Sequence, residues 1–270
     1  MDAVAKGIID NYKSFDEDSR LRSAYGIIEE EHTRKLIAKH LASQPLDVYD
    51  VGGGTGHYSL WLASLAHRVY FSDIVPKHVD IFRNRSQNVA SINIEDARAL
   101  SYANDVADLV ILNGPLYHLL ERDDRLKALN EAKRILKPNG LLLAFSISRF
   151  AGLNYALSSG EIFNDDYFEM VKGEVASGVR DNRPGKNKTF VSAYFHLLEE
   201  VESEVKEAGL SVENSFGVGL MWSPPGIDEI LTNPVKRLRL LQAVELIESN
   251  PMQGAKMLTV GRKIEHRITI

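Results

Sequence analysis

The sequence predicts an α/β fold in which helices cover both faces of a mostly parallel, doubly wound sheet. Three observations lead to this prediction. Between residues 46 and 147, short apolar runs alternate with segments of helical periodicity. The connections between these segments are short, which is typical of successive strand–helix units. A cluster of glycines in residues 52–56 stands where the first apolar run gives way to the first helical segment.

The predicted strands are short, apolar and rich in β-branched residues, as expected of strands buried on both faces of a sheet. Five of them precede residue 150 and are Leu46–Val51, Arg68–Ser72, Ser91–Glu95, Ala107–Leu112 and Leu141–Ile147. Two more, Leu210–Gly217 and Met257–Lys263, follow a long stretch without clean periodicity. The sequence therefore predicts seven strands.

Helices are predicted between these strands. The helix after the glycines has apolar residues at i, i+3, i+4 and i+7, namely Tyr58, Trp61, Leu62 and Leu65. Further helices are predicted over Pro76–Asn88, Arg122–Leu136 and Leu198–Ala208. The helix that starts at Arg122 is expected to end before a Lys-Pro-Asn-Gly sequence, because proline and glycine do not continue a helix.

The chain divides into a sheet core and three added segments. Residues 1–44 are polar and helical and form an N-terminal segment or lid. Residues 45–148 form the core, and residues 149–197 are an insertion expected to cover the carboxyl ends of the strands. Residues 198–270 complete the core and carry a second insertion at about 220–253, with one helix near Pro234–Glu248.

Composition excludes several classes of protein. With 44% hydrophobic and 26% charged residues, the chain is an ordinary globular protein. It has no cysteine, which excludes disulfides, thiolate metal ligands and cysteine nucleophiles, and its histidines show no metal-ligand spacing, so no metal is expected. No run approaches the roughly 18 apolar residues of a membrane helix, and no secretory leader opens the sequence. We therefore expect a cytoplasmic protein without a membrane partner.

The formal net charge of −5 makes nucleic acid an unfavourable partner, since binding a phosphate backbone requires an excess of Lys and Arg on one face. One basic stretch, residues 180–188, nevertheless carries Arg180, Arg183, Lys186 and Lys188. Two interpretations of it are open: the solvated tip of a hairpin, or a lid that meets an anionic substrate.

The glycine cluster belongs to the sequence Asp50-Val51-Gly52-Gly53-Gly54-Thr55-Gly56, at a strand-to-helix turn. Glycines there permit positive φ and let a ligand approach the backbone closely, while the helix N-terminus attracts anionic groups. A dinucleotide-binding turn has the pattern G-x-G-x-x-G, but the sixth position counted from Gly52 is His57. A nicotinamide dehydrogenase is therefore the less favoured alternative.

The pattern D-x-G-x-G-x-G resembles the first motif of class I S-adenosylmethionine-dependent methyltransferases. The resemblance continues with Asp73 at the end of the second strand, Asp96-Ala97 after the third and Asn113-Gly114 after the fourth. The sequence EAKRILKPNGLLLAFS, before and within the fifth strand, also resembles that family. The resemblance covers about Pro45–Ser148 and extends to the last two strands. It implies a Rossmann-like seven-stranded sheet with an antiparallel last strand.

The resemblance also implies a cofactor, S-adenosyl-L-methionine, and residues that bind it. The backbone of the turn is expected to hold the methionine end, Asp73 both ribose hydroxyls, and Asp96 the exocyclic amine of adenine. The alternative role of either aspartate is to cap a helix or turn. The implied cofactor-binding residues are Asp50, Gly52, Gly53, Gly54, Gly56, Asp73, Ile74, Asp96, Ala97, Asn113 and Gly114.

The implied reaction is methyl transfer to an O, N, S or C atom of a small-molecule acceptor. His118 and Tyr117, which follow the fourth strand, are the candidates for a general base, needed only if the nucleophile arrives protonated. The alternative for His118 is inert packing at a strand end. Tyr12 and Tyr25 are expected to pack on the sheet edge rather than fold over the cofactor.

Other functions remain open at this point. The chain could methylate RNA or protein through the basic residues 180–188, or bind the cofactor without turnover. The sequence also leaves the oligomeric state open, with a homodimer as one alternative.

Overall fold

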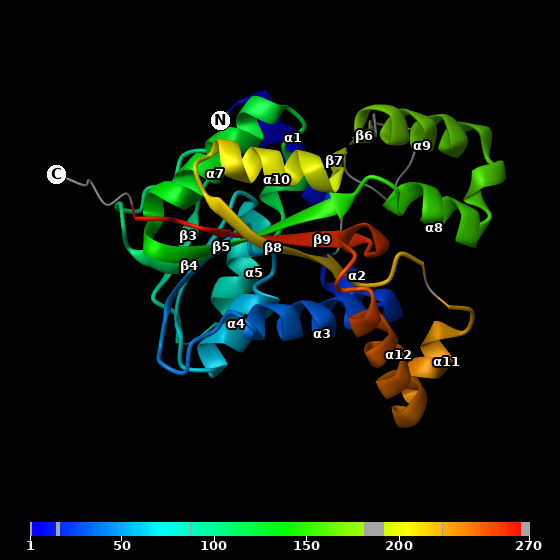
Figure 1. Ribbon diagram of the computed structural model, residues 1–270, viewed down its shortest axis with the longest axis horizontal. Coiled ribbons are helices and arrows are strands. Elements are labelled where there is room, and N and C mark those ends of the chain that lie inside the picture. Colours follow the sequence, from blue (N-terminus) through cyan, green and yellow to red (C-terminus); the bar gives the residue numbers. More distant parts are fainter. Residues whose placement is uncertain (1, 15–16, 87, 181–191, 223, 266–270) are drawn as a thin grey trace.

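The computed structural model describes residues 2–14, 17–86, 88–180, 192–222 and 224–265. A sheet runs through the middle of the molecule (Figure 1). The described strands are β1 (Asp47–Val51), β2 (Arg68–Asp73), β3 (Ser91–Ile94), β4 (Ala107–Leu112), β5 (Leu136–Ser148), β6 (Val179–Arg180), β7 (Ala193–His196), β8 (Ser211–Val218) and β9 (Lys256–Arg262). All seven predicted strands are present; Ala107–Leu112 matches at both ends, and no end of the others is shifted by more than five residues.

The strand order confirms the predicted sheet. Strands β3, β2, β1, β4 and β5 are neighbours in that order and run parallel. Strand β9 pairs antiparallel with β5 on one side and with β8 on the other. The last strand is therefore the antiparallel member of a seven-stranded sheet. Two short strands add to it: β7 pairs with the end of β5, and β6 pairs with β7.

Helices cover both faces of the sheet, so its strands are buried on both sides (Figure 1). On one face lie α7 (Arg122–Ile135) and α10 (Leu198–Glu207). On the other lie α3 (Ala24–Ala38), α4 (His57–Ser64) and α5 (Pro76–Arg85). Each side has its own apolar core, and β4 contributes to both.

Successive residues of β4 show why its apolar run is continuous. Val110 and Leu112 pack into the core beneath α7 and α10, whereas Leu109 and Ile111 pack against α3 and α4. Because neighbouring side chains of a strand point to opposite faces, a strand covered on both sides needs apolar residues at every position.

The two insertions contain more regular structure than predicted. Residues 149–197 hold α8 (Ala151–Ser159), a 3₁₀ turn (Glu161–Phe163), α9 (Asp165–Ser177) and the strands β6 and β7. The second insertion holds α11 (Ile227–Thr232), α12 (Pro234–Leu246) and a 3₁₀ turn (Pro251–Gln253), rather than one helix. The helix α9 was not predicted because one of its buried residues is charged. Its inward face holds Tyr167, Val171 and the fully buried Glu174, and Glu174 interrupts the apolar period.

Arg180, the first residue of the basic stretch, is not solvated. Arg180 is only 2% exposed, and its Nε donates to Oε2 of the buried Glu174 at 2.6 Å. Its charge is therefore neutralised inside the protein instead of being displayed on the surface. Arg183, Lys186 and Lys188 lie outside the described residues, so the basic contact proposed for them stays a prediction.

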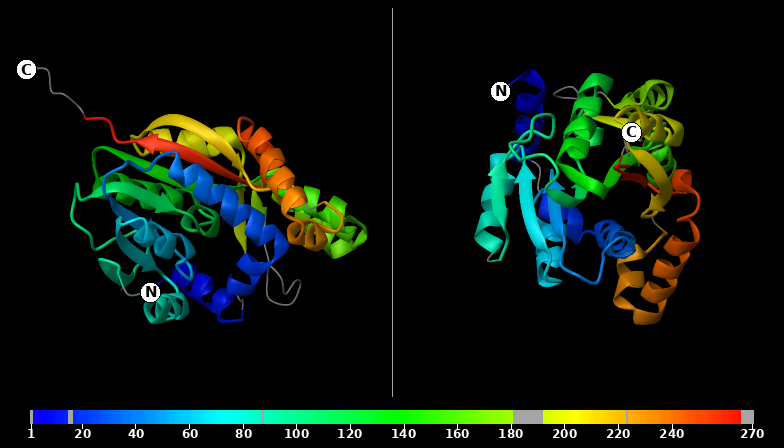
Figure 2. Two further views of the ribbon diagram at one scale, coloured as in Figure 1. Left: turned by 90° about the horizontal axis from the view of Figure 1, so that it is seen from below. Right: turned by 60° about the vertical axis from the view of Figure 1, so that its left-hand side comes forward.

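The N-terminal helices reach the end of the sheet where the parallel strands stop. α3 packs on the sheet through Leu36 and Ile37. The shorter α1 (Ala3–Ser14) and α2 (Glu17–Arg22) precede it, and α2 contacts α3 (Figure 2). Among the described helices, none combines the length and apolar character that a membrane crossing requires.

Candidate active site

The carboxyl ends of β1 to β4 meet at one edge of the sheet because these strands run parallel. The strand order reverses between β1 and β4, and ligands of doubly wound sheets bind at such a reversal. A cavity of about 100 Å³ lies there. It is lined by every predicted site residue except Gly56: Asp50, Gly52, Gly53, Gly54, Asp73, Ile74, Asp96, Ala97, Asn113, Gly114, Tyr117 and His118.

The glycines of the turn serve different purposes. Gly56 has φ +84°, and a Cβ there would lie 1.9 Å from Phe82, so packing against Phe82 requires a glycine at this position. Gly54 also has a positive φ, +59°, but a Cβ on it would meet no described protein atom within 4 Å. The open side of Gly54 faces the cavity, which is where the predicted close approach of a ligand requires a glycine.

Asp50 is a buried carboxylate with one oxygen satisfied. Ser59 Oγ donates to its Oδ2 at 2.7 Å, while Oδ1 has no partner among the described residues. Burial, with the nearby Asp73 carboxylate as a smaller contribution, raises the pKa of Asp50 to about 6. A cation or hydrogen-bond donor arriving in the cavity would therefore stabilise the ionised form.

Asp73 joins the end of β2 to the glycine turn. Its Oδ2 accepts from Gly54 N and its Oδ1 from Val75 N, both at 2.8 Å. His78 Nδ1 lies 3.4 Å from Oδ1. The carboxylate thus has the local turn role that the sequence left open, and it still lines the cavity. A carboxylate oxygen can accept a second hydrogen bond, so this contact does not conflict with a ribose role.

Asp96 is held more tightly than the sequence suggested. Arg98 Nε and Nη2 donate to its two oxygens at 3.0 and 2.6 Å, and Arg98 N donates to Oδ1 at 2.9 Å. Arg98 also pairs with Asp124 and Asp2. The neighbouring Ala97 is buried and gives the cavity an apolar wall. Asp96 therefore enters the site with its orientation fixed by Arg98.

The segment after β4 supplies Asn113, Tyr117 and His118 to the cavity wall. Asn113 presents a buried Oδ1 without a described partner. His118, on the short helix α6 (Pro115–His118), accepts from or donates to Tyr12 Oη through Nε2 at 2.9 Å. Burial lowers the pKa of His118 to about 4, so the ring is neutral at pH 7. Its Nδ1 is buried and has no described hydrogen-bond partner.

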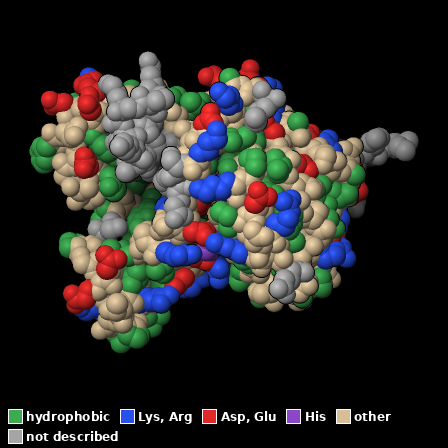
Figure 3. Space-filling model, turned by 180° about the vertical axis from the view of Figure 1, so that it is seen from behind, with side chains coloured by type: hydrophobic (Ala, Val, Ile, Leu, Met, Phe, Trp, Pro, Cys, Tyr) green, Lys and Arg blue, Asp and Glu red, His purple; other side chains and the backbone are tan. Residues whose placement is uncertain are grey.

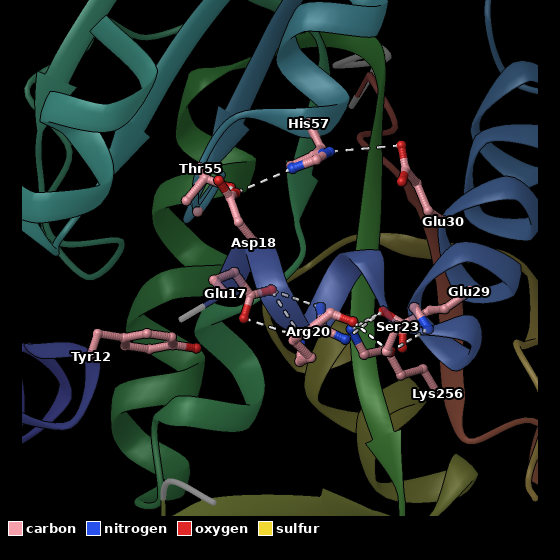
Figure 4. Close-up of polar contacts among 12 residues, drawn as sticks. Tyr12, Glu17, Asp18, Arg20, Ser23, Glu29, Glu30, Thr55, His57 and Lys256 are labelled. Carbon is pink, nitrogen blue, oxygen red and sulfur yellow. Dashed lines mark hydrogen bonds and ion pairs between the residues drawn. The ribbon is translucent and has the colours of Figure 1, made fainter. Parts of the chain in front are cut away.

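The N-terminal segment contributes more to the site than predicted. Tyr12 lies in the cavity against His118 and His78, not on a sheet edge. Asp18 of α2 accepts from Thr55 Oγ1 at 2.6 Å and lies 3.4 Å from His57 Nε2, which fixes α2 to the glycine turn (Figure 4). Arg85 of α5 pairs with the same carboxylate. These contacts join residues that are far apart in the sequence, so no local sequence pattern could predict them.

A second cavity, of about 530 Å³, adjoins the first. Its wall includes Tyr155 of α8, Tyr167 of α9, and Met221 and Trp222, which precede α11. Figure 3 shows hydrophobic side chains in a hollow between the lobe of α8 and α9 and the lobe of α11 and α12. The two insertions therefore enclose a largely apolar space beside the polar edge of the sheet, as the sequence suggested.

Four charged side chains lie where the two cavities meet, and sequence analysis missed all of them. Arg20 Nη2 donates to Glu17 at 2.7 Å, and Arg20 Nη1 lies 3.4 Å from Glu29 (Figure 4). Lys256 Nζ donates to the same Glu29 oxygen at 2.9 Å. We call these residues the charged quartet; its formal charges cancel. A lysine opening an apolar strand is the one sequence signal that points to it.

The residues present fit a polar cofactor at this edge. Asp50, Asn113 and His118 line one cavity and each has a buried polar atom without a described partner, and the turn leaves the side of Gly54 free. Buried polar groups of folded proteins normally have partners, so their gathering at one place indicates a ligand.

Comparison with known proteins agrees with this arrangement. Residues 49–144 match the family described as "Methyltransferase domain". The ubiquinone/menaquinone biosynthesis C-methyltransferase UbiE of Hydrogenovibrio crunogenus is 30% identical over 138 residues, which are 44% of this chain and 53% of that protein. The chain thus spans about half the length of this relative.

Solved structures share the fold over most of the chain. A SAM-dependent methyltransferase from Methanosarcina mazei has a TM-score of 0.61 at 16% identity, covering 85% of this chain and 97% of its own. The 1,6-didemethyltoxoflavin-N1-methyltransferase of Burkholderia thailandensis, solved with 1,6-didemethyltoxoflavin and S-adenosylhomocysteine, has a TM-score of 0.55 at 13% identity, covering 97% and 88%.

Proposed function

Since residues 49–144 form a methyltransferase domain of the class I S-adenosylmethionine-dependent family, we propose that this chain transfers the methyl group of S-adenosylmethionine to a small-molecule acceptor. One observation carries the proposal: a cavity with charged and polar lining residues at the carboxyl ends of β1 to β4 adjoins an apolar cavity of about 530 Å³. The lining residues of the first offer hydrogen-bonding groups to a polar cofactor, and the volume of the second is that of a site for a modest organic molecule.

Each cofactor residue has a role that its chemistry supports. The open Oδ1 of Asp50 suits the ammonium group of the methionine part, because an arriving cation compensates a buried carboxylate. Asp73 suits the ribose hydroxyls, and the backbone at Gly54 leaves room for the ligand between them. Asp96 and Ala97 suit the adenine, and we assign Asn113 and Gly114 to the surroundings of the methyl group because they follow β4 and line the same cavity.

The chemistry needs little from the protein beyond placement. A lone pair of the acceptor forms a bond to the methyl carbon, the sulfur–methyl bond breaks, and its electron pair stays on sulfur, leaving S-adenosylhomocysteine. Holding the two reactants in line and away from water supplies much of the acceleration. An acceptor that enters protonated loses its proton to water or to a base.

His118 and Tyr117 are proposed to face the acceptor, since both line both cavities. With its pKa lowered to about 4 by burial, His118 is unprotonated at neutral pH but is a weak base. Its bond to Tyr12 makes it better suited to orienting that hydroxyl than to removing a proton on its own.

Two features support a small acceptor over RNA or protein. The apolar cavity is enclosed by the insertions, and Arg180 is committed to Glu174 inside the fold. Turnover is the discriminating experiment. Purified protein is incubated with methyl-tritiated S-adenosylmethionine and a panel of small hydroxyl, amine and thiol compounds, with RNA and a protein extract in parallel. Label in a small molecule supports the proposal. Label in RNA or protein alone would refute it, and cofactor binding without any turnover would leave a binding protein.

A further inference from the structure

The apolar cavity is built to hold a flat ring. Its wall includes seven aromatic side chains: Tyr12, Tyr25, Tyr117, Tyr155, Tyr167, Phe195 and Trp222. Aromatic faces favour stacked or edge-on contact with another ring. A volume of about 530 Å³ lies within the range of about 300–1,000 Å³ that is usual for small-molecule sites.

Lys256 is the ammonium group at the inner end of this cavity. It is the first residue of β9, is only 9% exposed, and lines both cavities. Its Nζ lies 5.3 Å from the centre of the Tyr117 ring (Figure 4 shows Lys256 beside Glu29 and Arg20). An ammonium carries three N–H donors, and within the described part of the chain only Glu29 accepts from Lys256. Two donors therefore remain for a ligand at the boundary between cofactor and acceptor.

The surroundings keep Lys256 charged. Burial is the largest single effect and lowers the pKa of Lys256, but Glu29, Tyr117 and Tyr58 together more than offset it, so the net shift is upward. Glu29 stays ionised, because Lys256 and Arg20 overcome its own burial and hold its pKa at about 2.

We propose, on the premise of the methyl transfer above, that the acceptor is a planar aromatic or conjugated molecule with an acidic hydroxyl group, and that Lys256 binds the oxygen of that hydroxyl as its oxyanion. The hydroxyl proton leaves to bulk water as the acceptor binds, and Lys256 keeps its own protons. An opposite charge in a buried site favours the ionised form of a bound acid. The resulting anion is the better nucleophile for a methyl group at the adjoining cavity.

The other ionisable groups around Lys256 hold one charge state between pH 6 and pH 9. They are Glu29 and Tyr25 on α3, Arg20 on α2, Tyr58 on α4, and Tyr117 and His118 on α6. Burial raises the pKa of each tyrosine, so the phenols remain neutral, and His118 is already unprotonated. Any ionisation seen in a bound ligand over this range therefore belongs to the ligand.

The test uses 4-nitrophenol, whose phenolate absorbs visible light, with full-length protein saturated with S-adenosylhomocysteine. Titration from pH 5 to pH 9 gives the pKa of the bound phenol. We expect a value lowered by about 1–2 units relative to free 4-nitrophenol. In Lys256→Met the shift disappears and phenolate binding weakens at least about tenfold. Lys256→Arg retains a lowered ligand pKa.

Two further variants make the result specific. Lys137→Met is the matched control, because Lys137 pairs with Asp47 and Asp108 at the amino ends of β1 and β4, and it should leave phenol binding unchanged. Glu29→Gln removes the anion that competes for Lys256, so it should lower the pKa of the bound phenol further, which also tests the proposal if Lys256→Met does not fold. Absence of 4-nitrophenol binding, or the same shift in wild type and Lys256→Met, would overturn the proposal. Failure of S-adenosylhomocysteine to bind would instead refute the methyltransferase function.

Discussion

Replacing Asp50 with asparagine probes the electrostatics of the glycine turn. The carboxylate is fully buried, accepts from Ser59 and has a second oxygen without a described partner. Its pKa is about 6 in the folded protein, compared with the ordinary value of 3.8. The folded state therefore binds the Asp50 proton more tightly than the unfolded state does, and stability is lost as pH rises through this window.

The magnitude follows from these two values. The wild type loses about 1.4 kcal/mol of unfolding free energy through ionisation of Asp50 between pH 5 and pH 8. The full loss, counted from a pH at which Asp50 is protonated in both the folded and the unfolded state, is about 3 kcal/mol. Asparagine does not titrate and still offers Ser59 an oxygen. Relative to wild type, the free energy of unfolding of Asp50→Asn should therefore be about 1.4 kcal/mol higher at pH 8 than at pH 5.

Both proteins are unfolded in urea at pH 5 and at pH 8. The result is how much the difference in unfolding free energy between variant and wild type changes between the two pH values. All other titrating groups cancel in that quantity. A difference between the two proteins that does not change with pH would refute the account of Asp50. The same variant should bind S-adenosylmethionine at least about tenfold more weakly, because it lacks the carboxylate for the ammonium group.

The remaining predictions concern three other positions. Asp73→Ala should cost about 1.5–3 kcal/mol of S-adenosylmethionine affinity in calorimetry, the scale of hydrogen bonds to a charged group; unchanged affinity would exclude the ribose role. Gly54→Val should fold with some strain, given φ +59° and open space around it, yet bind the cofactor more weakly still than Asp73→Ala; wild-type affinity would show that no ligand approaches this glycine. Glu204→Gln should destabilise the fold by about 3–5 kcal/mol in urea unfolding, because Arg125, itself 2% exposed, would lose its buried partner at 2.8 Å; a loss under 1 kcal/mol would contradict that pairing.

The sheet and the cofactor edge could be predicted because their signals are local. Strands such as Ala107–Leu112 contain apolar runs, here Leu109–Leu112, and the glycine turn joins another strand to a helix. Once the strands are known to be parallel, their carboxyl ends must share an edge, so Asp50, Asp73 and Asn113 come together without any knowledge of tertiary contacts.

The acceptor side could not be predicted in the same way. Glu29 and Lys256 are 227 positions apart, and Tyr12 meets His118 across 106 positions. Such pairs form because of how the N-terminal helices and β9 pack. Hydrophobic periodicity along the sequence does not predict this packing. The helix α9 was missed for a related reason, since its inward face includes the paired Glu174 where an apolar residue was expected.

The most direct test of the central claim is isothermal titration of the purified protein with S-adenosylmethionine, S-adenosylhomocysteine and NAD. We predict micromolar binding of the two sulfur nucleosides and none of NAD, with S-adenosylhomocysteine affinity reduced in Asp73→Ala. A folded wild-type sample that binds neither sulfur nucleoside would contradict the claim that the carboxyl edge of β1 to β4 is a methyl-donor site.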